Sequence, residues 1–485
     1  MSVSDLVRRG HELSAHGSYP EAEVLLRAAV ADDPGNAMAW NNLGWVRQRV
    51  GDPAEAEACY REALARDGGQ VLARRNLCRL LIAEGNVPAT RPLLLRELDS
   101  GDSGFEWCTE LITRLFVDTD FAAAGEVARI LAEVRWSSPA FPLGQGPVAA
   151  HPAGRFLTAA KLRHDAEQLA YLAERDLLGF DVSGDPAAYE RIAARLEQAG
   201  IDRQVPLSDG DEEEIGEVYN RIIHVRETPR VTRALSTGWD GARVAEDYRA
   251  HRGVVVIDDF LTGEALRELR AFCLESTVWT ANRYGHGRLG AFFHDGFNCP
   301  LLLQIAEELR NALPTVLRPE YPLRQVWAFK NGYKQPAGST LHADFASVNV
   351  NFWITPESAN REPETGGLDV YDSDAPLWWD FAAYNGRADL MRSLLESRRA
   401  TVTKIPYREN RALVFNSDLF HATQGVDFRT GYANRRINVT FLFGDRENDR
   451  DFPQAATPTD SPSAGPGGVT VPWRSRALRS SRRGR

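Results

Sequence analysis

The chain has few of the features on which disulfide-bonded, zinc-binding or membrane-spanning proteins depend. Its five cysteines are scattered along 485 residues and none lies in a CxxC pair. The sequence therefore indicates neither a disulfide framework nor a thiolate zinc site. No apolar run approaches the roughly 20 residues of a membrane-spanning helix, and the first residues lack an apolar run of signal-peptide length. These absences predict a cytoplasmic protein with no membrane partner.

Positive charge is also scarce. The net charge is −10, and only four of the 57 basic residues are lysines. A net acidic chain is a poor match for a polyanion, so we expect no nucleic-acid partner. Hydrophobic residues make up 43% and charged residues 26% of the chain, which is typical of a globular protein. The length predicts two to four domains.

Three similar segments recur near the start of the chain with a period of 34 residues. They read GSYPEAEVLLRAA, GDPAEAEACYREA and GNVPATRPLLLRE and begin at Gly17, Gly51 and Gly85. A fixed period of this length is typical of stacked helical hairpins. Small residues such as Gly10 and Gly44 recur where two helices must approach closely. The pattern resembles the tetratricopeptide repeat over residues 1–135, with a degenerate third copy and a fourth around DTDFAAAGEVARIL.

Two roles for this repeat array stay open. It can bind a peptide or partner protein on a concave surface, or it can support the fold of the domain that follows. Residues 136–250 read as a helical linker region with Pro- and Gly-rich joints. Residues 449–485 are rich in Pro, Ser and Gly and carry six arginines between Arg474 and Arg485. They are predicted to form a disordered basic tail.

Between the linker and the tail, residues 251–448 change to the rhythm of a β-domain. GVVVIDDFLTGEALRELRAFC reads as an apolar strand followed by an amphipathic helix, with Thr262 as its N-cap. Strand-like runs follow, separated by turn residues: QVWAFKNGY, SVNVNFWITP, GGLDVYD, TVTKIPY, RALVFNS and RRINVTFLFG. This succession predicts a closed or double-sheet β-fold.

The only two histidines beyond residue 294 fall at the edges of these predicted strands. His342 and Asp344 form an HxD motif, and side chains two apart on an extended segment point the same way. His421 in NSDLFHAT would complete a set of two imidazoles and one carboxylate. Such a set leaves metal positions open and is typical of non-haem Fe(II) oxygenases. Arg436 stands fifteen residues after His421, on the predicted strand face of Asn438 and Thr440, where it could bind a carboxylate.

Together, the HxD motif, the GG-containing strand, NRALVFNSDLFHAT and the arginine strand resemble the Fe(II)/2-oxoglutarate-dependent oxygenases, in particular their prolyl-hydroxylase-like branch. The resemblance implies a jelly-roll (double-stranded β-helix) core with flanking helices. It implies that His342, Asp344 and His421 hold Fe(II), with 2-oxoglutarate and O2 as cosubstrates. It further implies that Arg436 binds the distal carboxylate of 2-oxoglutarate, although Arg435 stays open as an alternative. Tyr333 is expected to touch the cosubstrate or to pack at the strand end.

The fold class predicted for the whole chain is therefore multidomain α + β. The expected activity is hydroxylation of an amino-acid side chain in a peptide or protein. Hydroxylation or desaturation of a free or carrier-bound small molecule, and a repeat-based adaptor with an inactive jelly roll, are the alternatives. An insertion at residues 373–400, rich in aromatic side chains, is interpreted either as a lid or as a segment packed on the sheet. The sequence leaves the oligomeric state open.

Overall fold

The computed structural model describes residues 1–136, 156–179, 185–216, 218–338 and 340–446. The predicted basic tail and the start of the predicted linker lie outside the described residues. Within them, no helix is both long and apolar enough to cross a bilayer.

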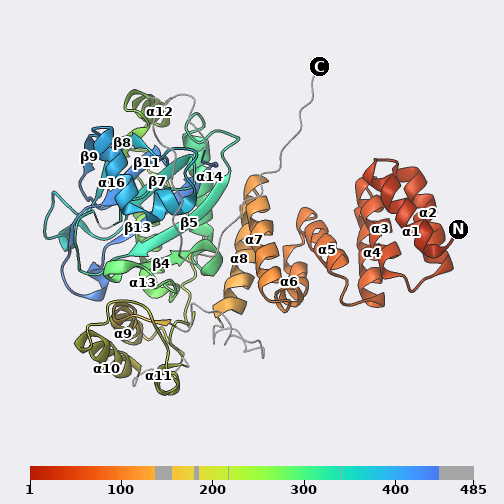
Figure 1. The fold of residues 1–485 in the computed structure, drawn as a ribbon, viewed down its shortest axis with the longest axis horizontal. Coiled ribbons are helices and arrows are strands. Elements are labelled where there is room, and N and C mark those ends of the chain that lie inside the picture. The colour runs from red at the N-terminus through yellow and green to blue at the C-terminus, as the bar shows by residue number, and fades with distance from the viewer. Residues whose placement is uncertain (137–155, 180–184, 217, 339, 447–485) are drawn as a thin grey trace. The chain divides into compact units, whose positions relative to one another are not determined.

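Helical hairpins make up the N-terminal part, drawn in red to orange in Figure 1. Side chains of Ser2, Asn36 and Asp52 each accept a backbone N–H at a helix start, which satisfies donors that the helix itself leaves unpaired. The helices are α1 (Val3–Ala15), α2 (Tyr19–Asp32), α3 (Ala37–Arg49), α4 (Pro53–Arg66), α5 (Val71–Ala83), η1 (Val87–Thr90), α6 (Arg91–Leu98), α7 (Asp102–Val117) and α8 (Phe121–Trp136).

The predicted close approach of the paired helices is confirmed. A Cβ atom on Gly10 would lie 2.7 Å from Cγ of Leu26, and one on Gly44 would lie 2.9 Å from Cδ1 of Tyr60. Both distances are shorter than real side-chain contacts, so the large residue of one helix fits only against glycine on the other.

The last hairpin contacts the 3-10 helix η5 (Phe293–Asp295). The ring of Phe116 in α7 lies 5.0 Å from that of Phe293, which is fully buried. Arg135 in α8 donates to Asp295 at 2.9 Å. The repeat array therefore shares part of its hydrophobic core with the chain beyond residue 250.

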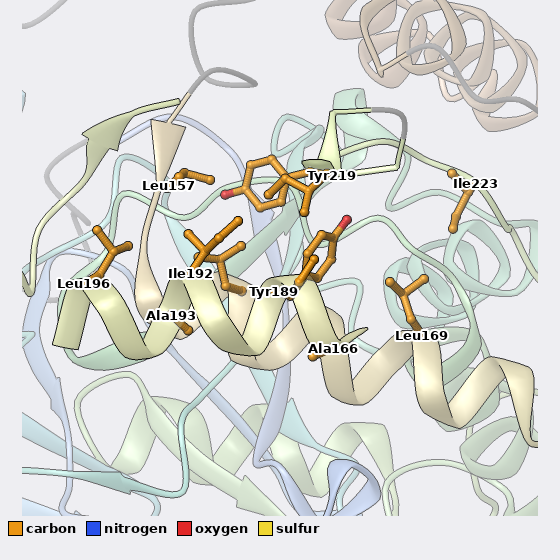
Figure 2. Packing of buried hydrophobic residues seen from close by; sticks show 12 residues of the cluster. Leu157, Ala166, Leu169, Tyr189, Ile192, Ala193, Leu196, Tyr219 and Ile223 are labelled. Atoms are coloured by element: carbon orange, nitrogen blue, oxygen red, sulfur yellow. The ribbon is translucent and has the colours of Figure 1, made fainter. Parts of the chain in front are cut away.

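Four α-helices and two short strands lie in the described part of residues 136–250, for which the sequence predicted helices. They are β1 (Phe156–Leu157), α9 (Ala159–Ala173), α10 (Asp185–Gln198), β2 (Val205–Pro206), α11 (Asp209–Ile215) and α12 (Gly241–Ala250). Figure 2 shows how α9 and α10 enclose a small core that includes Leu169, Tyr189 and Ile192. The short pairing of β1 with β2 was not predicted.

Antiparallel strands dominate the chain beyond residue 250. The largest sheet has the order β3-β10-β7-β13-β5-β4, a second has the order β11-β8-β9, and β12 pairs with β6. The strands are β3 (Val254–Ile257), β4 (Leu289–Phe292), β5 (Leu323–Lys330), β6 (Lys334–Gln335), β7 (Val348–Trp353), β8 (Leu368–Asp374), β9 (Val402–Ile405), β10 (Ala412–Asn416), β11 (Leu419–Thr423), β12 (Val426–Asp427) and β13 (Ile437–Phe443). The helices are α13 (Gly263–Glu275), α14 (Pro300–Ala312), α15 (Phe381–Gly386) and α16 (Ala388–Ser397), with 3-10 turns η4 (Gly285–Gly287), η6 (Glu357–Ala359) and η7 (Tyr432–Asn434).

Apolar side chains of the two larger sheets share one core. Trp353, Leu413 and Phe415 of the six-stranded sheet form a buried cluster with Val370 and Leu419 of the three-stranded sheet. The predicted cap at Thr262 is confirmed, because its hydroxyl accepts the Ala265 N–H at 3.2 Å. The C-terminal region is therefore rich in antiparallel sheet, with helices beside it.

Candidate metal centre

Backbone pairing brings the two predicted histidines together. His342 and His421 form an isolated antiparallel bridge, in which each N–H donates to the other residue's carbonyl at 3.0 and 2.8 Å. The N–H of Asp344 donates to the carbonyl of Ser417 at 3.1 Å. The HxD segment is thus held against β11 and the turn that precedes it.

The three side chains converge. Nε2 of His342 lies 3.7 Å from Oδ1 of Asp344, and Nε2 of His421 lies 3.6 Å from Oδ2. Their ligand atoms all lie within 4.8 Å of one another, and no other group of His, Cys, Asp or Glu in the described residues is arranged in this way. Two imidazoles and one carboxylate at this spacing suit a divalent transition metal.

Hydrogen bonds orient both imidazoles for metal binding. Nδ1 of His421 lies 3.0 Å from the carbonyl oxygen of Leu419, and Nδ1 of His342 is bonded to the carbonyl of Thr340. Because a carbonyl only accepts, each Nδ1 donates, and the Nε2 lone pair is left facing Asp344. Burial lowers the pKa of His342 to about 4, so this imidazole is neutral at pH 7, the state in which it can bind a metal.

Neighbouring residues also hold the carboxylate in place. Asn349 in β7 donates to Oδ2 of Asp344 at 2.7 Å, and Oδ1 of that amide is buried without a partner in the described residues. Backbone N–H and C=O of Ala343, between the two ligands, bond to the carbonyl of Tyr384 at 2.9 Å and the side-chain amide of Asn385 at 3.2 Å. The insertion therefore orients the HxD segment.

The aromatic side chains of this insertion divide into two pairs. Trp379 and Tyr384 join a buried cluster with Phe420, which agrees with the packing interpretation. Trp378 and Phe381 are exposed.

Arg436 lies on the predicted strand face and is almost completely buried. Its Nε donates to the carbonyl of Gly366 at 2.5 Å, and its Nη1 donates to Oδ1 of Asn331 at 3.0 Å and of Asn438 at 3.1 Å. Burial lowers its pKa to about 10, so the guanidinium is still charged at neutral pH. In the described part of the chain no carboxylate forms an ion pair with it. A buried cation whose chain partners are all neutral is a suitable site for an anionic ligand.

Glycine at position 366 is required by this arrangement. Its φ is +81°, in the region that side-chain-bearing residues rarely adopt. The carbonyl of this same glycine accepts the hydrogen bond from Nε of Arg436.

Arg435 has a different environment from its neighbour. Its Nε donates to Oε2 of Glu167 in α9 at 2.7 Å, and its guanidinium lies 4.6 Å from the centre of the Tyr333 ring. The hydroxyl of Tyr333 donates to the same Glu167 oxygen at 2.7 Å. These contacts connect the middle helix to the sheet. The cosubstrate role predicted for Tyr333 stays a prediction, and its hydroxyl is already bonded to Glu167.

Sequence reasoning did not identify several residues around the centre. Asn385 lies in the insertion, and Asn331 is a buried amide after β5. Arg288 directly precedes β4. In the sequence, Arg288, Gly290 and Phe292 are spaced two residues apart, so a short strand there would place all three on one face.

Comparison with known proteins identifies the N-terminal part. Two models of the tetratricopeptide repeat match residues 7–49 and 37–69, so this part contains tetratricopeptide repeats. No curated protein matches the chain. The type III secretion translocator chaperone SycD of Yersinia enterocolitica is 20% identical, with 26% of this chain and 90% of that chain covered and a TM-score of 0.22. The non-heme α-ketoglutarate-dependent carbocyclase SnoK from nogalamycin biosynthesis is 12% identical, with 44% and 87% covered and a TM-score of 0.29.

Proposed function

We propose that this protein is an Fe(II)- and 2-oxoglutarate-dependent dioxygenase that hydroxylates an amino-acid side chain in a peptide or protein. The observation that carries the proposal is the convergence of His342, Asp344 and His421, with both Nε2 atoms facing the carboxylate. The antiparallel sheets around them would form a double-stranded β-helix.

In this proposal His342, Asp344 and His421 hold Fe(II), and Arg436 holds 2-oxoglutarate. Bound iron supplies O2 activation, which couples oxidative decarboxylation of 2-oxoglutarate to insertion of oxygen into a substrate C–H bond. The chain's own part is to position these components. Asn349 orients Asp344, and backbone carbonyls fix the protonated nitrogen of each imidazole. Burial of Arg436 keeps water away from its charge, which strengthens its pairing with a carboxylate.

The tetratricopeptide repeats support a protein or peptide as the substrate, because such repeats present extended surfaces to partner chains. A free or carrier-bound small molecule is the alternative substrate class. Both would use the same metal centre, so the metal and the cosubstrate can be tested before the substrate is known.

The proposal is tested by anaerobic Fe(II) titration and by succinate formation from 2-oxoglutarate in air. The wild-type chain should bind one Fe(II) and form succinate, and His421→Ala should lose both because one imidazole ligand is removed. His251→Ala is the matched control, since His251 is exposed and its ring is hydrogen-bonded to the carbonyl of Asp247 in α12. Iron binding and succinate formation by His421→Ala at the wild-type level would refute the proposal.

A further inference from the structure

Arg288 is a second arginine on the face of the large sheet that carries Arg436. Gly290 in β4 pairs with Phe329 in β5, which pairs in turn with Asn438 in β13. Directly opposed residues in an antiparallel sheet point to the same side, so Gly290 shares the face of Asn438. Residues two apart on an extended segment also share a face, which places Arg288 with Gly290 and Arg436 with Asn438.

Electrostatic effects agree with this placement. Burial is the main effect on the pKa of Arg288 and lowers it, while the charge of Asp344 raises it. Burial lowers the pKa of His342 and of Arg436, and the positive charge of Arg288 lowers both pKa values further. The Arg288 guanidinium is therefore close enough to act on two of the proposed iron ligands and on the proposed cosubstrate site.

The guanidinium of Arg288 has no hydrogen-bonding or ionic partner in the described part of the chain. Its Cζ lies 4.0 Å from the centre of the Phe329 ring and 4.9 Å from that of Tyr284. Its Nε is shielded from solvent and donates to no acceptor. Ring faces stabilise the charge but accept none of the five N–H bonds in the plane of the group. No acceptor in the described chain uses these donors, and the side chain is only partly buried, so they are available to a ligand.

The sheet face beside Arg288 is also less covered than the rest. Leu413 and Phe415 are fully buried on this face, whereas Phe292, Trp327 and Phe345 are only partly buried. The centre of the Trp327 ring lies 6.0 Å from those of Phe292 and Phe345, and Phe345 directly follows the aspartate of the HxD motif. An aromatic wall that reaches solvent thus adjoins the candidate metal centre.

We propose that Arg288 binds a carboxylate of the substrate and holds it beside the iron ligands, with the aromatic wall against the substrate's apolar part. This rests on the proposed function and specifies its substrate class. The carboxylate belongs either to an acidic side chain in a peptide or to the end of a free amino acid. Arg436 remains for 2-oxoglutarate, since it is buried deeper and has neutral hydrogen-bond partners.

Three small probes separate these sources when their binding to the full chain with 2-oxoglutarate is followed by ligand-observed NMR. N-acetylaspartate amide carries a side-chain carboxylate, N-acetylasparagine a terminal carboxylate, and N-acetylasparagine amide neither. The wild-type chain should bind one acidic probe about 10- to 100-fold more tightly than the neutral one, as expected for hydrogen bonds to a charged group. Arg288→Met should lose this preference, and Arg288→Lys should retain part of it.

The matched control is Arg283→Met, because Arg283 is exposed and lies 5.4 Å from the same Tyr284 ring. This variant should keep the wild-type preference. A preference for the side-chain carboxylate assigns an acidic side chain, and a preference for the terminal carboxylate assigns an α-carboxylate such as that of a free amino acid. The proposal is overturned if the wild-type chain shows no preference, if Arg288→Met keeps it, or if that variant loses only affinity for 2-oxoglutarate.

Succinate formation tests the proposed oxygenase function separately from the carboxylate site. If the wild-type chain forms no succinate, the oxygenase assignment falls. An acid preference that depends on Arg288 would still establish the carboxylate site, because probe binding is measured without turnover.

Discussion

Replacing Arg436 with methionine should remove 2-oxoglutarate binding and spare iron binding. Methionine fills part of the same volume but has neither charge nor donors. Three of the five guanidinium donors are used by Gly366, Asn331 and Asn438. The two donors of Nη2 form no hydrogen bond in the described part of the chain and are available to a ligand.

The two Nη2 donors set the expected magnitude. A hydrogen bond to a charged group contributes about 1.5–3 kcal/mol net, so two such bonds to a carboxylate contribute about 3–6 kcal/mol. Each 1.4 kcal/mol corresponds to a factor of ten in the dissociation constant, so Kd for 2-oxoglutarate should rise about 10²- to 10⁴-fold. None of the three proposed iron ligands bonds to Arg436, so Fe(II) affinity should change by less than about threefold.

Anaerobic isothermal titration of 2-oxoglutarate into the Fe(II)-loaded chain measures this directly. Arg435→Met is the matched control, because its side chain is paired with Glu167 and contacts Tyr333. That variant should keep cosubstrate affinity and lower the unfolding temperature, since Glu167 loses its cationic partner. Wild-type affinity in Arg436→Met would refute the assignment, and a loss confined to Arg435→Met would move the site to the other face of the strand.

Two further variants test how distant segments support the centre. Asn385→Ala removes the hydrogen bond to the carbonyl of Ala343, so Fe(II) affinity should fall about tenfold, as is typical of residues that orient ligands; unchanged affinity in an anaerobic titration would contradict this role. Phe116→Ala removes a ring packed on buried Phe293 and should lower the free energy of unfolding by about 3–5 kcal/mol. Chemical denaturation measures this loss, and an unchanged midpoint would contradict a supporting role for the repeats.

Local periodicity was sufficient to predict most of the sheet. Alternation along RRINVTFLFG placed Arg436 and Asn438 on one strand face, and their hydrogen bond at 3.1 Å confirms it. The 34-residue period predicted the repeats, and repeat models match residues 7–69. The convergence of His342, Asp344 and His421 was predicted from the HxD motif, the position of His421 and the resemblance to the oxygenase family. These features depend on patterns within one segment or on residues with few alternatives in the chain.

Several features that depend on which distant segments pair were not predicted. β4 and β11 were not among the predicted strands, and β4 contains Gly290 and Ala291, which are depleted in strands. Arg288 faces the centre only because β4 pairs with β5 and β5 with β13. Asn385 reaches Ala343 from an insertion 42 residues later. The Tyr333 hydroxyl is bonded to Glu167, which lies 166 residues earlier in the chain.

Three arginines near the centre differ in whether the chain supplies an anion. Arg435 is paired with Glu167, and this ion pair joins α9 to the sheet. Arg436 and Arg288 have no ionic partner in the described residues and lie on one sheet face, where the charge of Arg288 adds to burial in lowering the pKa of Arg436. Arg436 is almost completely buried and Arg288 is partly buried, and such cations lower stability to the extent that each loses hydration without gaining an anion. A fold that keeps both recovers this free energy only when two anions bind. Under the proposed function, the same two charges would favour binding of the cosubstrate and of an acidic substrate together.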